Sequence, residues 1–129
     1  MYPKEYRYSK DHEWVHVQED GKVRFGVTMF AGEHLGDVVF VELPEVGDEV
    51  TQGEAFCVIE SVKAVADCYA GVSGTIIEVN EKLEEDPALI NQDPHGEGWI
   101  AVIEPSDLSE LDNLMEIDEY EAFAAEDER

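Results

Sequence analysis

Basic residues are scarce in this sequence of 129 residues: 8 are Lys or Arg, whereas 32 are Asp or Glu, and the net charge is −24. A nucleic-acid binder neutralises phosphates with clustered basic side chains, so this composition excludes that class of protein. The same charge disfavours binding to the anionic surface of a membrane. We therefore expect protein partners that present basic docking surfaces.

Long apolar runs and cysteine are also scarce. No run of 18 apolar residues occurs, so we expect no membrane-spanning helix. The opening residues, MYPKEYRYSK, lack the apolar region of a signal peptide and the pattern of a transit peptide. The two cysteines do not form a CxxC motif, and the four histidines lack zinc-ligand spacing. These absences predict a cytoplasmic protein without a metal site.

Hydrophobic residues make up 43% of the chain, which is close to the globular average and sufficient for a packed core. The length favours one domain over residues 1–129. Short apolar segments separated by Gly and Pro turns predict a mainly β, antiparallel sandwich or barrel. The predicted strands cover residues 6–8, 14–17, 23–27, 37–43, 55–60, 65–69, 75–79 and 99–103.

Helices are predicted in two places. Thr28 has the chemistry of an N-cap and precedes a short helix over residues 29–35. Towards the C-terminus the apolar period changes to that of a helix, which predicts a helical segment over about residues 106–125. Asp107 and Glu110 have capping-box spacing at the start of that segment.

A lysine occupies the turn between two predicted core strands. If Val62 and Lys63 are the central residues of a tight hairpin, Cys57 lies directly opposite Cys68, and the apolar arms fix this register. Lys63 is then exposed and rigidly presented, and it is the only basic residue between positions 51 and 80. Exposure and a fixed position suit covalent attachment, although the isolated turn is more typical of an ordinary solubilising lysine.

The segment Glu60-Ser61-Val62-Lys63-Ala64 resembles the lipoylation site of the glycine cleavage system H protein family. Six further segments match that family in the same order: HEWV at 12–15, LGDVVFVELP at 35–44, VSG at 72–74, EVN at 78–80, LIN at 89–91 and GEGW at 96–99. The resemblance covers essentially the whole chain. It implies an antiparallel barrel-sandwich hybrid of the lipoyl/biotinyl-carrier type, with short helices and a C-terminal helical segment.

The resemblance implies a carrier that catalyses no reaction itself. Lipoate would be joined to Lys63 by an amide bond. The arm would carry the aminomethyl group of glycine from a pyridoxal-phosphate glycine decarboxylase (P protein) to a tetrahydrofolate-dependent aminomethyltransferase (T protein). A dihydrolipoyl dehydrogenase (L protein) would reoxidise the arm, and a lipoylating enzyme would recognise Glu60, Ser61, Val62 and Ala64. A monomer is expected.

The family also suggests where the loaded arm docks. Glu13 and Asp67 occupy positions at which carboxylates would face the cationic amine, and His34 would lie close to the arm. The alternative is simpler. In a chain with 32 acidic residues, any two carboxylates can be solvated, and His34 can be a surface residue of a short helix.

Rival functions differ in their sequence signals. A lipoyl domain of a 2-oxoacid dehydrogenase would show Asp-Lys-Ala, and a biotin carrier would show methionines beside the lysine. An enzyme would need a phosphate loop, a nucleophile–base pair or a metal cluster, and the sequence shows none of these. A relay that passes lipoate to other carrier domains remains the alternative, because residues 29–32 (MFAG) depart from the more polar family stretch.

The cysteine pair has two interpretations. Cys57 and Cys68 are expected to be small buried hydrophobic side chains that stay reduced. The predicted register also permits a cross-strand disulfide. Nucleophilic catalysis is disfavoured, because no His or basic residue is near either cysteine in the sequence.

Overall fold

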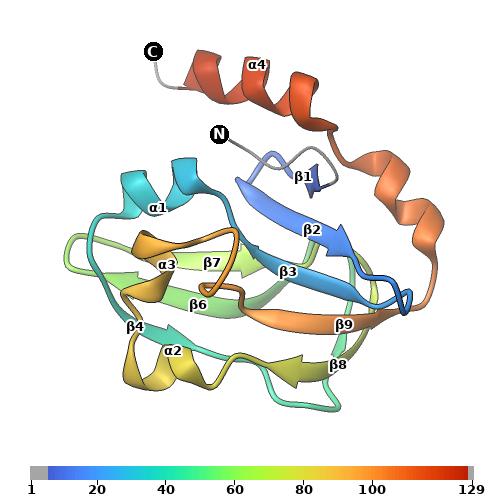
Figure 1. Ribbon diagram of the computed structural model, residues 1–129, viewed down its shortest axis with the longest axis horizontal. Helices are drawn as coiled ribbons and strands as arrows, with labels where there is room; N and C mark the ends of the chain where they lie inside the picture. The colour runs from blue at the N-terminus through green and yellow to red at the C-terminus, as the bar shows by residue number, and fades with distance from the viewer. Residues whose placement is uncertain (1–5, 128–129) are drawn as a thin grey trace.

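The computed structural model describes residues 6–127 and arranges their strands in two antiparallel sheets (Figure 1). The larger sheet has the order β1-β2-β3-β9-β8-β5, and the smaller sheet has the order β4-β6-β7. The strands are β1 (Arg7–Tyr8), β2 (Glu13–Val17), β3 (Val23–Val27), β4 (Val38–Glu42), β5 (Glu49–Val50), β6 (Ala55–Ser61), β7 (Val65–Tyr69), β8 (Gly74–Val79) and β9 (Ala101–Pro105). The predicted mainly β, antiparallel fold is confirmed.

Short helices connect and cover the sheets. They are α1 (Met29–Leu35), α2 (Lys82–Glu85), α3 (Leu89–Gln92), the 3-10 helix η1 (Leu108–Asn113) and α4 (Ile117–Asp127). Within residues 6–127, none of these helices is long and apolar enough to span a membrane. In Figure 1, α1 and α3 lie beside the smaller sheet, and α4 packs near the N-terminal strands.

The core consists of apolar side chains from both sheets. Phe25, Ile59, Ile76 and Ile103 are fully buried in it. A second cluster, which includes Tyr8, Trp14, Phe30 and Tyr120, joins α4 to β1, β2 and α1. These two clusters hold α1 and the smaller sheet in fixed positions.

The predicted helix over residues 29–35 is confirmed together with its boundaries. The Thr28 hydroxyl oxygen accepts a hydrogen bond from the Ala31 N–H, at 3.3 Å, as an N-cap does. Gly36 ends the helix with φ 77°, in the left-handed region that favours glycine. Gly36 therefore sets the path of the loop between α1 and β4. This loop contacts the lysine turn.

The C-terminal prediction needs correction. The helical segment expected over about residues 106–125 consists of two helices, η1 and α4. Asp107 caps η1 by accepting from the Ser109 N–H, at 3.0 Å. The Glu110 carboxylate does not complete the capping box. It accepts from the Ser73 N–H and hydroxyl, at 2.7 and 2.8 Å, because a tertiary partner lies within reach.

Candidate functional site

The lysine turn closes the hairpin of β6 and β7. The Ser61 N–H donates to the Ala64 carbonyl oxygen, at 2.8 Å, and Cys57 lies opposite Cys68, as the predicted register requires. The Ser61 hydroxyl oxygen also accepts from the N–H groups of Lys63 and Ala64, at 3.3 and 3.1 Å. These bonds explain how a turn without glycine is held, because a serine side chain can replace a backbone acceptor.

The loop between α1 and β4 braces this turn from one side. The Val62 N–H donates to the Asp37 carbonyl oxygen, at 3.0 Å. The Lys63 side chain is exposed, and its aliphatic part lies against Gly36, where an added Cβ atom would be 3.3 Å from Lys63 Cε. The lysine is therefore presented to solvent from a braced position.

Asn91 on α3 fixes the path of that loop. Its Nδ2 donates to the carbonyl oxygens of Gly32 and Gly36, at 3.1 and 2.8 Å, and its Oδ1 accepts from the Val38 N–H, at 2.9 Å. Sequence reasoning placed Asn91 only within a matching segment. Its three partners are backbone atoms more than fifty positions away, so neither spacing nor periodicity could reveal this clamp.

A cavity of about 220 Å³ lies between α1, β2 and β7. The structure brings Glu13, His34 and Asp67, the three predicted docking residues, together in its wall. The apolar part of the wall is formed by Val27, Phe30, Leu35, Ile59 and Cys68, among others. Lys63 and its predicted recognition residues lie outside this wall, at the end of the hairpin. These recognition residues are Glu60, Ser61, Val62 and Ala64.

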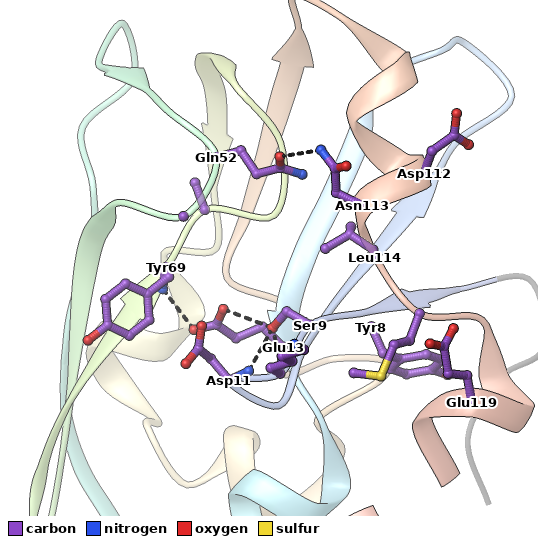
Figure 2. Close-up of a pocket in the computed structure, with 14 residues that line it drawn as sticks. Tyr8, Ser9, Asp11, Glu13, Gln52, Tyr69, Asp112, Asn113, Leu114 and Glu119 are labelled. Atoms are coloured by element: carbon purple, nitrogen blue, oxygen red, sulfur yellow. Dashed lines mark hydrogen bonds between the residues drawn. The ribbon is translucent and has the colours of Figure 1, made fainter. Parts of the chain in front are cut away.

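Glu13 is the buried carboxyl of the cavity, with 3% of its surface exposed. Burial raises the pKa of Glu13 to about 8, although the hydrogen bond from the Tyr69 N–H, at 2.7 Å, acts in the opposite direction. The Ser9 hydroxyl also donates to it, at 3.3 Å (Figure 2). Glu13 therefore holds a proton at neutral pH.

Glu13 also lines a second and larger cavity, of about 580 Å³. Figure 2 shows Tyr69 and Gln52 on one side of this cavity, with Asn113 and Leu114 on the other. Asn113 Nδ2 donates to Gln52 Oε1, at 3.0 Å, across its rim. Glu13 thus contributes to the walls of both cavities.

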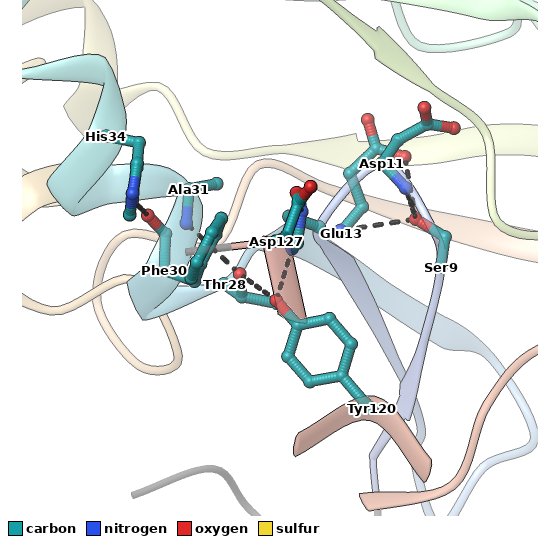
Figure 3. A network of polar contacts seen from close by, with 10 residues as sticks. Ser9, Asp11, Glu13, Thr28, Phe30, Ala31, His34, Tyr120 and Asp127 are labelled. Atoms are coloured by element: carbon teal, nitrogen blue, oxygen red, sulfur yellow. Dashed lines mark hydrogen bonds and ion pairs between the residues drawn. The ribbon is translucent and has the colours of Figure 1, made fainter. Parts of the chain in front are cut away.

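Three stacked rings, those of His12, Phe30 and His34, lie in the wall of the smaller cavity. The centroids of His12 and Phe30 are 4.2 Å apart. Those of Phe30 and His34, both labelled in Figure 3, are 4.0 Å apart. His34 Nδ1 donates to the Phe30 carbonyl oxygen, at 2.9 Å. This bond fixes the ring and requires a proton on Nδ1, so that Nε2 of a neutral His34 is the acceptor nitrogen.

A hydrogen-bond chain ties α4 to the same wall (Figure 3). The Tyr120 hydroxyl contacts Thr28 Oγ1 and His12 Nδ1, both at 2.8 Å, and His12 Nε2 contacts the Asp127 carboxylate, also at 2.8 Å. His12 has φ 63°, which is uncommon for a residue other than glycine. No sequence pattern predicts these hydrogen bonds, because the residues that each of them joins are 92 to 115 positions apart.

Exposed apolar side chains surround the lysine turn. Val62 and Val65 are 68% and 69% exposed, and Phe40 on β4 is also exposed. Phe40 lies opposite Glu60, which lies opposite Val65, so these three side chains form one row across the smaller sheet. We call Val39, Phe40, Val62 and Val65 the apolar patch.

The comparisons with known proteins agree with one another. The family model described as glycine cleavage H-protein matches residues 6–127. A glycine cleavage system H protein of Geobacillus thermodenitrificans is 56% identical over 124 residues, which cover 96% of this chain and 97% of that protein. The corresponding protein of Coprothermobacter proteolyticus is 58% identical over 120 residues, covering 93% and 94%.

A solved structure of the same family has the same fold. The crystal structure of a glycine cleavage system H protein from Mycobacterium marinum superposes with a TM-score of 0.86 at 41% identity, covering 99% of this chain and 100% of that chain. The barrel-sandwich hybrid is thereby confirmed. This chain belongs to the glycine cleavage H-protein family, the lipoyl carriers of glycine cleavage that catalyse no step themselves.

Proposed function

We propose that this chain carries lipoate as an amide on Lys63 and shuttles the aminomethyl group of glycine. The observation that carries the proposal is the position of Lys63: it is exposed at a braced turn, and the hairpin strand that follows it forms part of a cavity wall. A lysine in that position can serve as an attachment point, and none of the ion pairs found among residues 6–127 involves Lys63.

The residues of the cavity suit a lipoyl arm. When bound, the lipoyl group supplies a cyclic disulfide that can carry a one-carbon unit. Phe30, Leu35 and Ile59 offer an apolar wall for the hydrocarbon chain. Glu13 and Asp67 offer carboxyl groups to an amine, and a cationic amine beside Glu13 would favour its ionised form and release its proton. Such a cavity would also keep water away from a labile group.

The proposed partners are the glycine decarboxylase, the aminomethyltransferase and the dihydrolipoyl dehydrogenase. Attachment to one protein raises the effective concentration of the arm at each enzyme. The net charge of −24 would steer the carrier towards basic docking surfaces. We also propose a cytoplasmic location, with which the free thiols of Cys57 and Cys68 are consistent.

The lipoylating enzyme would recognise the turn and the apolar patch together. Ser61 shapes the turn through its hydroxyl, whereas Val62 and Ala64 flank the lysine and are exposed. Glu60 lies between Phe40 and Val65 in the row across the smaller sheet. An exposed apolar patch beside a reactive side chain is typical of a docking surface, and its acidic neighbours favour a partner with basic residues at the rim.

The attachment site is tested by intact mass after expression with a lipoylating system. The expected result is one lipoyl adduct, which Lys63→Arg removes. Lys82→Arg is the matched control, because Lys82 is an exposed lysine on α2, away from the turn, and its replacement should leave the adduct unchanged. An adduct that persists in Lys63→Arg would overturn the assignment.

A second candidate function is the relay of lipoate to other carrier domains. It is favoured by residues 29–32 (MFAG), because Phe30 lies in the cavity wall between His12 and His34. Glycine–bicarbonate exchange with the decarboxylase distinguishes the two functions. Fully lipoylated protein that supports exchange favours glycine cleavage, whereas fully lipoylated protein that does not support it favours the relay.

A further inference from the structure

Cys57 on β6 and Cys68 on β7 lie directly opposite each other, and both are buried. Hydrogen-bonded and non-hydrogen-bonded pairs alternate along an antiparallel ladder. The pair of Ser61 and Ala64 is hydrogen bonded, and four steps along the ladder the Cys57–Cys68 pair is of the same type. Such pairs have Cα atoms about 5.5 Å apart, which is the separation found in many disulfides.

The register is continuous from the turn to the cysteines. The irregularity in this ladder falls between Ala55 and Cys57, on the far side of the pair, so it does not separate the two thiols. A side-chain hydrogen bond with Cys57, together with burial, raises the pKa of the Cys68 thiol well above its usual value. As paired residues of neighbouring strands, the two cysteines point their side chains to the same face of the hairpin, where both are buried.

We propose that Cys57 and Cys68 form a thiol–disulfide pair, a modification site on the hairpin that presents Lys63, and that a small disulfide oxidises it. One cysteine thiolate attacks a sulfur of the small disulfide, forms a mixed disulfide and releases one thiolate. The second cysteine attacks the protein sulfur of that mixed disulfide and releases the other thiolate. One S–S bond breaks, one forms, and the two cysteine protons pass to the two released thiolates.

Burial sets the rates of this exchange. Thiolate is the attacking form, the raised pKa of the Cys68 thiol makes its thiolate scarce, and both cysteines are buried, so oxidation in the folded protein is slow. The product is buried as well, which slows its reduction. The bond would join both arms of the hairpin four ladder steps from the Ser61–Ala64 pair, and it would alter the cavity wall, because Cys68 lines the cavity.

The test uses full-length Lys63→Arg protein, so that no lipoyl disulfide is present. The native protein is incubated at increasing ratios of oxidised to reduced glutathione until its mass distribution is constant, and is then alkylated in denaturant. The expected product is lighter than the reduced protein by two hydrogen atoms before alkylation and contains a peptide that links Cys57 to Cys68. Its thermal midpoint should rise by about 10 °C, because the cross-link restricts the unfolded chain.

Two variants provide the controls. Cys57→Ser and Cys68→Ser, each in the Lys63→Arg background, should show neither the mass loss nor the rise of the thermal midpoint. Two alkylated cysteines at every glutathione ratio would overturn the proposal. A disulfide that forms only in denaturant would also overturn it. Oxidation that stops at a mixed disulfide with glutathione would do the same. The result does not depend on whether Lys63 is the lipoylation site.

Discussion

The aliphatic part of the Lys63 side chain lies against Gly36, and a Cβ atom on Gly36 would be 3.3 Å from Lys63 Cε. Gly36 also has φ 77°, a backbone conformation that residues with a Cβ atom rarely adopt. Glycine is therefore favoured at position 36 for two independent reasons. The backbone has a positive φ, and the Lys63 side chain leaves little room for a Cβ atom. The residue that ends α1 also shapes the presentation of the proposed attachment site.

Gly36→Ala should slow lipoylation as well as destabilise the fold. The positive φ costs about 1 kcal/mol for alanine, and the added methyl group pushes against the Lys63 side chain. Gly21→Ala is the control, because Gly21 has φ 85° with open space around it and lies in a different turn. Denaturant unfolding should show a loss in both variants, whereas the rate of lipoylation should fall only in Gly36→Ala. Equal rates would show that the contact with Lys63 is unimportant.

Asn91→Ala should cost about 2–3 kcal/mol in the free energy of unfolding, because it leaves the Gly32 and Gly36 carbonyls and the Val38 N–H without their partner. The loop beside Lys63 should then become more mobile, which faster amide exchange of Val38 would reveal. Asn113→Ala, which removes an exposed contact with Gln52, should change the stability far less. Comparable losses in the two variants would contradict the role of Asn91 as a clamp.

Tyr120→Phe tests the connection between α4 and the cavity wall. It removes the hydroxyl that contacts both Thr28 and His12, and we expect a loss of about 1–2 kcal/mol in unfolding free energy. The ring stacking of Tyr120 on Tyr8 should persist. Proteolysis of α4 in the native state should become faster than in the unaltered protein. Unchanged proteolysis and stability would mean that packing alone holds α4.

Phe40→Ser tests the apolar patch. Phe40 is exposed, so its replacement should leave the thermal midpoint nearly unchanged, whereas loss of an aromatic contact should slow lipoylation about tenfold. Val46→Ser is the control, because Val46 is an exposed apolar residue in the segment between β4 and β5. Initial rates with the purified lipoylating enzyme provide the measurement. Identical rates for both variants would remove the patch from the docking surface.

The local features of the fold could be predicted from the sequence. The hairpin register followed from two apolar arms around Val62 and Lys63, and the first helix followed from Thr28 and Gly36. These predictions succeeded because each depends on neighbours within a few positions. The capping-box prediction for Glu110 is wrong, since its carboxylate accepts hydrogen bonds from Ser73 and not from its own helix end.

The candidate site was only partly predictable, because many of its contacts join residues that are far apart in the sequence. Family resemblance brought Glu13, His34 and Asp67 into consideration, and the structure places them in one cavity wall. The clamp of Asn91 and the contacts of Tyr120 depend on backbone and side-chain atoms that only folding brings together. Composition and periodicity carry no information about such long-range polar contacts.

The buried carboxyl of Glu13 should make stability depend on pH. Its pKa is raised from 4.5 to about 8 by burial, so between these values the folded protein binds more protons than the unfolded chain. The contribution of Glu13 is therefore full below about pH 4.5 and is lost as the pH rises towards 8. It falls by at most about 1.4 kcal/mol per pH unit. Glu13→Gln, which keeps the shape of the neutral side chain, should remove this contribution.

The measurement is the free energy of unfolding from denaturant titrations at several pH values between 5 and 8. All other titrating groups act in both proteins, so the difference between unaltered protein and Glu13→Gln isolates Glu13. The unaltered protein should lose stability relative to the variant as the pH rises through this range. Parallel curves would contradict a protonated Glu13, and a loss in the opposite direction would show that the cavity stabilises the carboxylate.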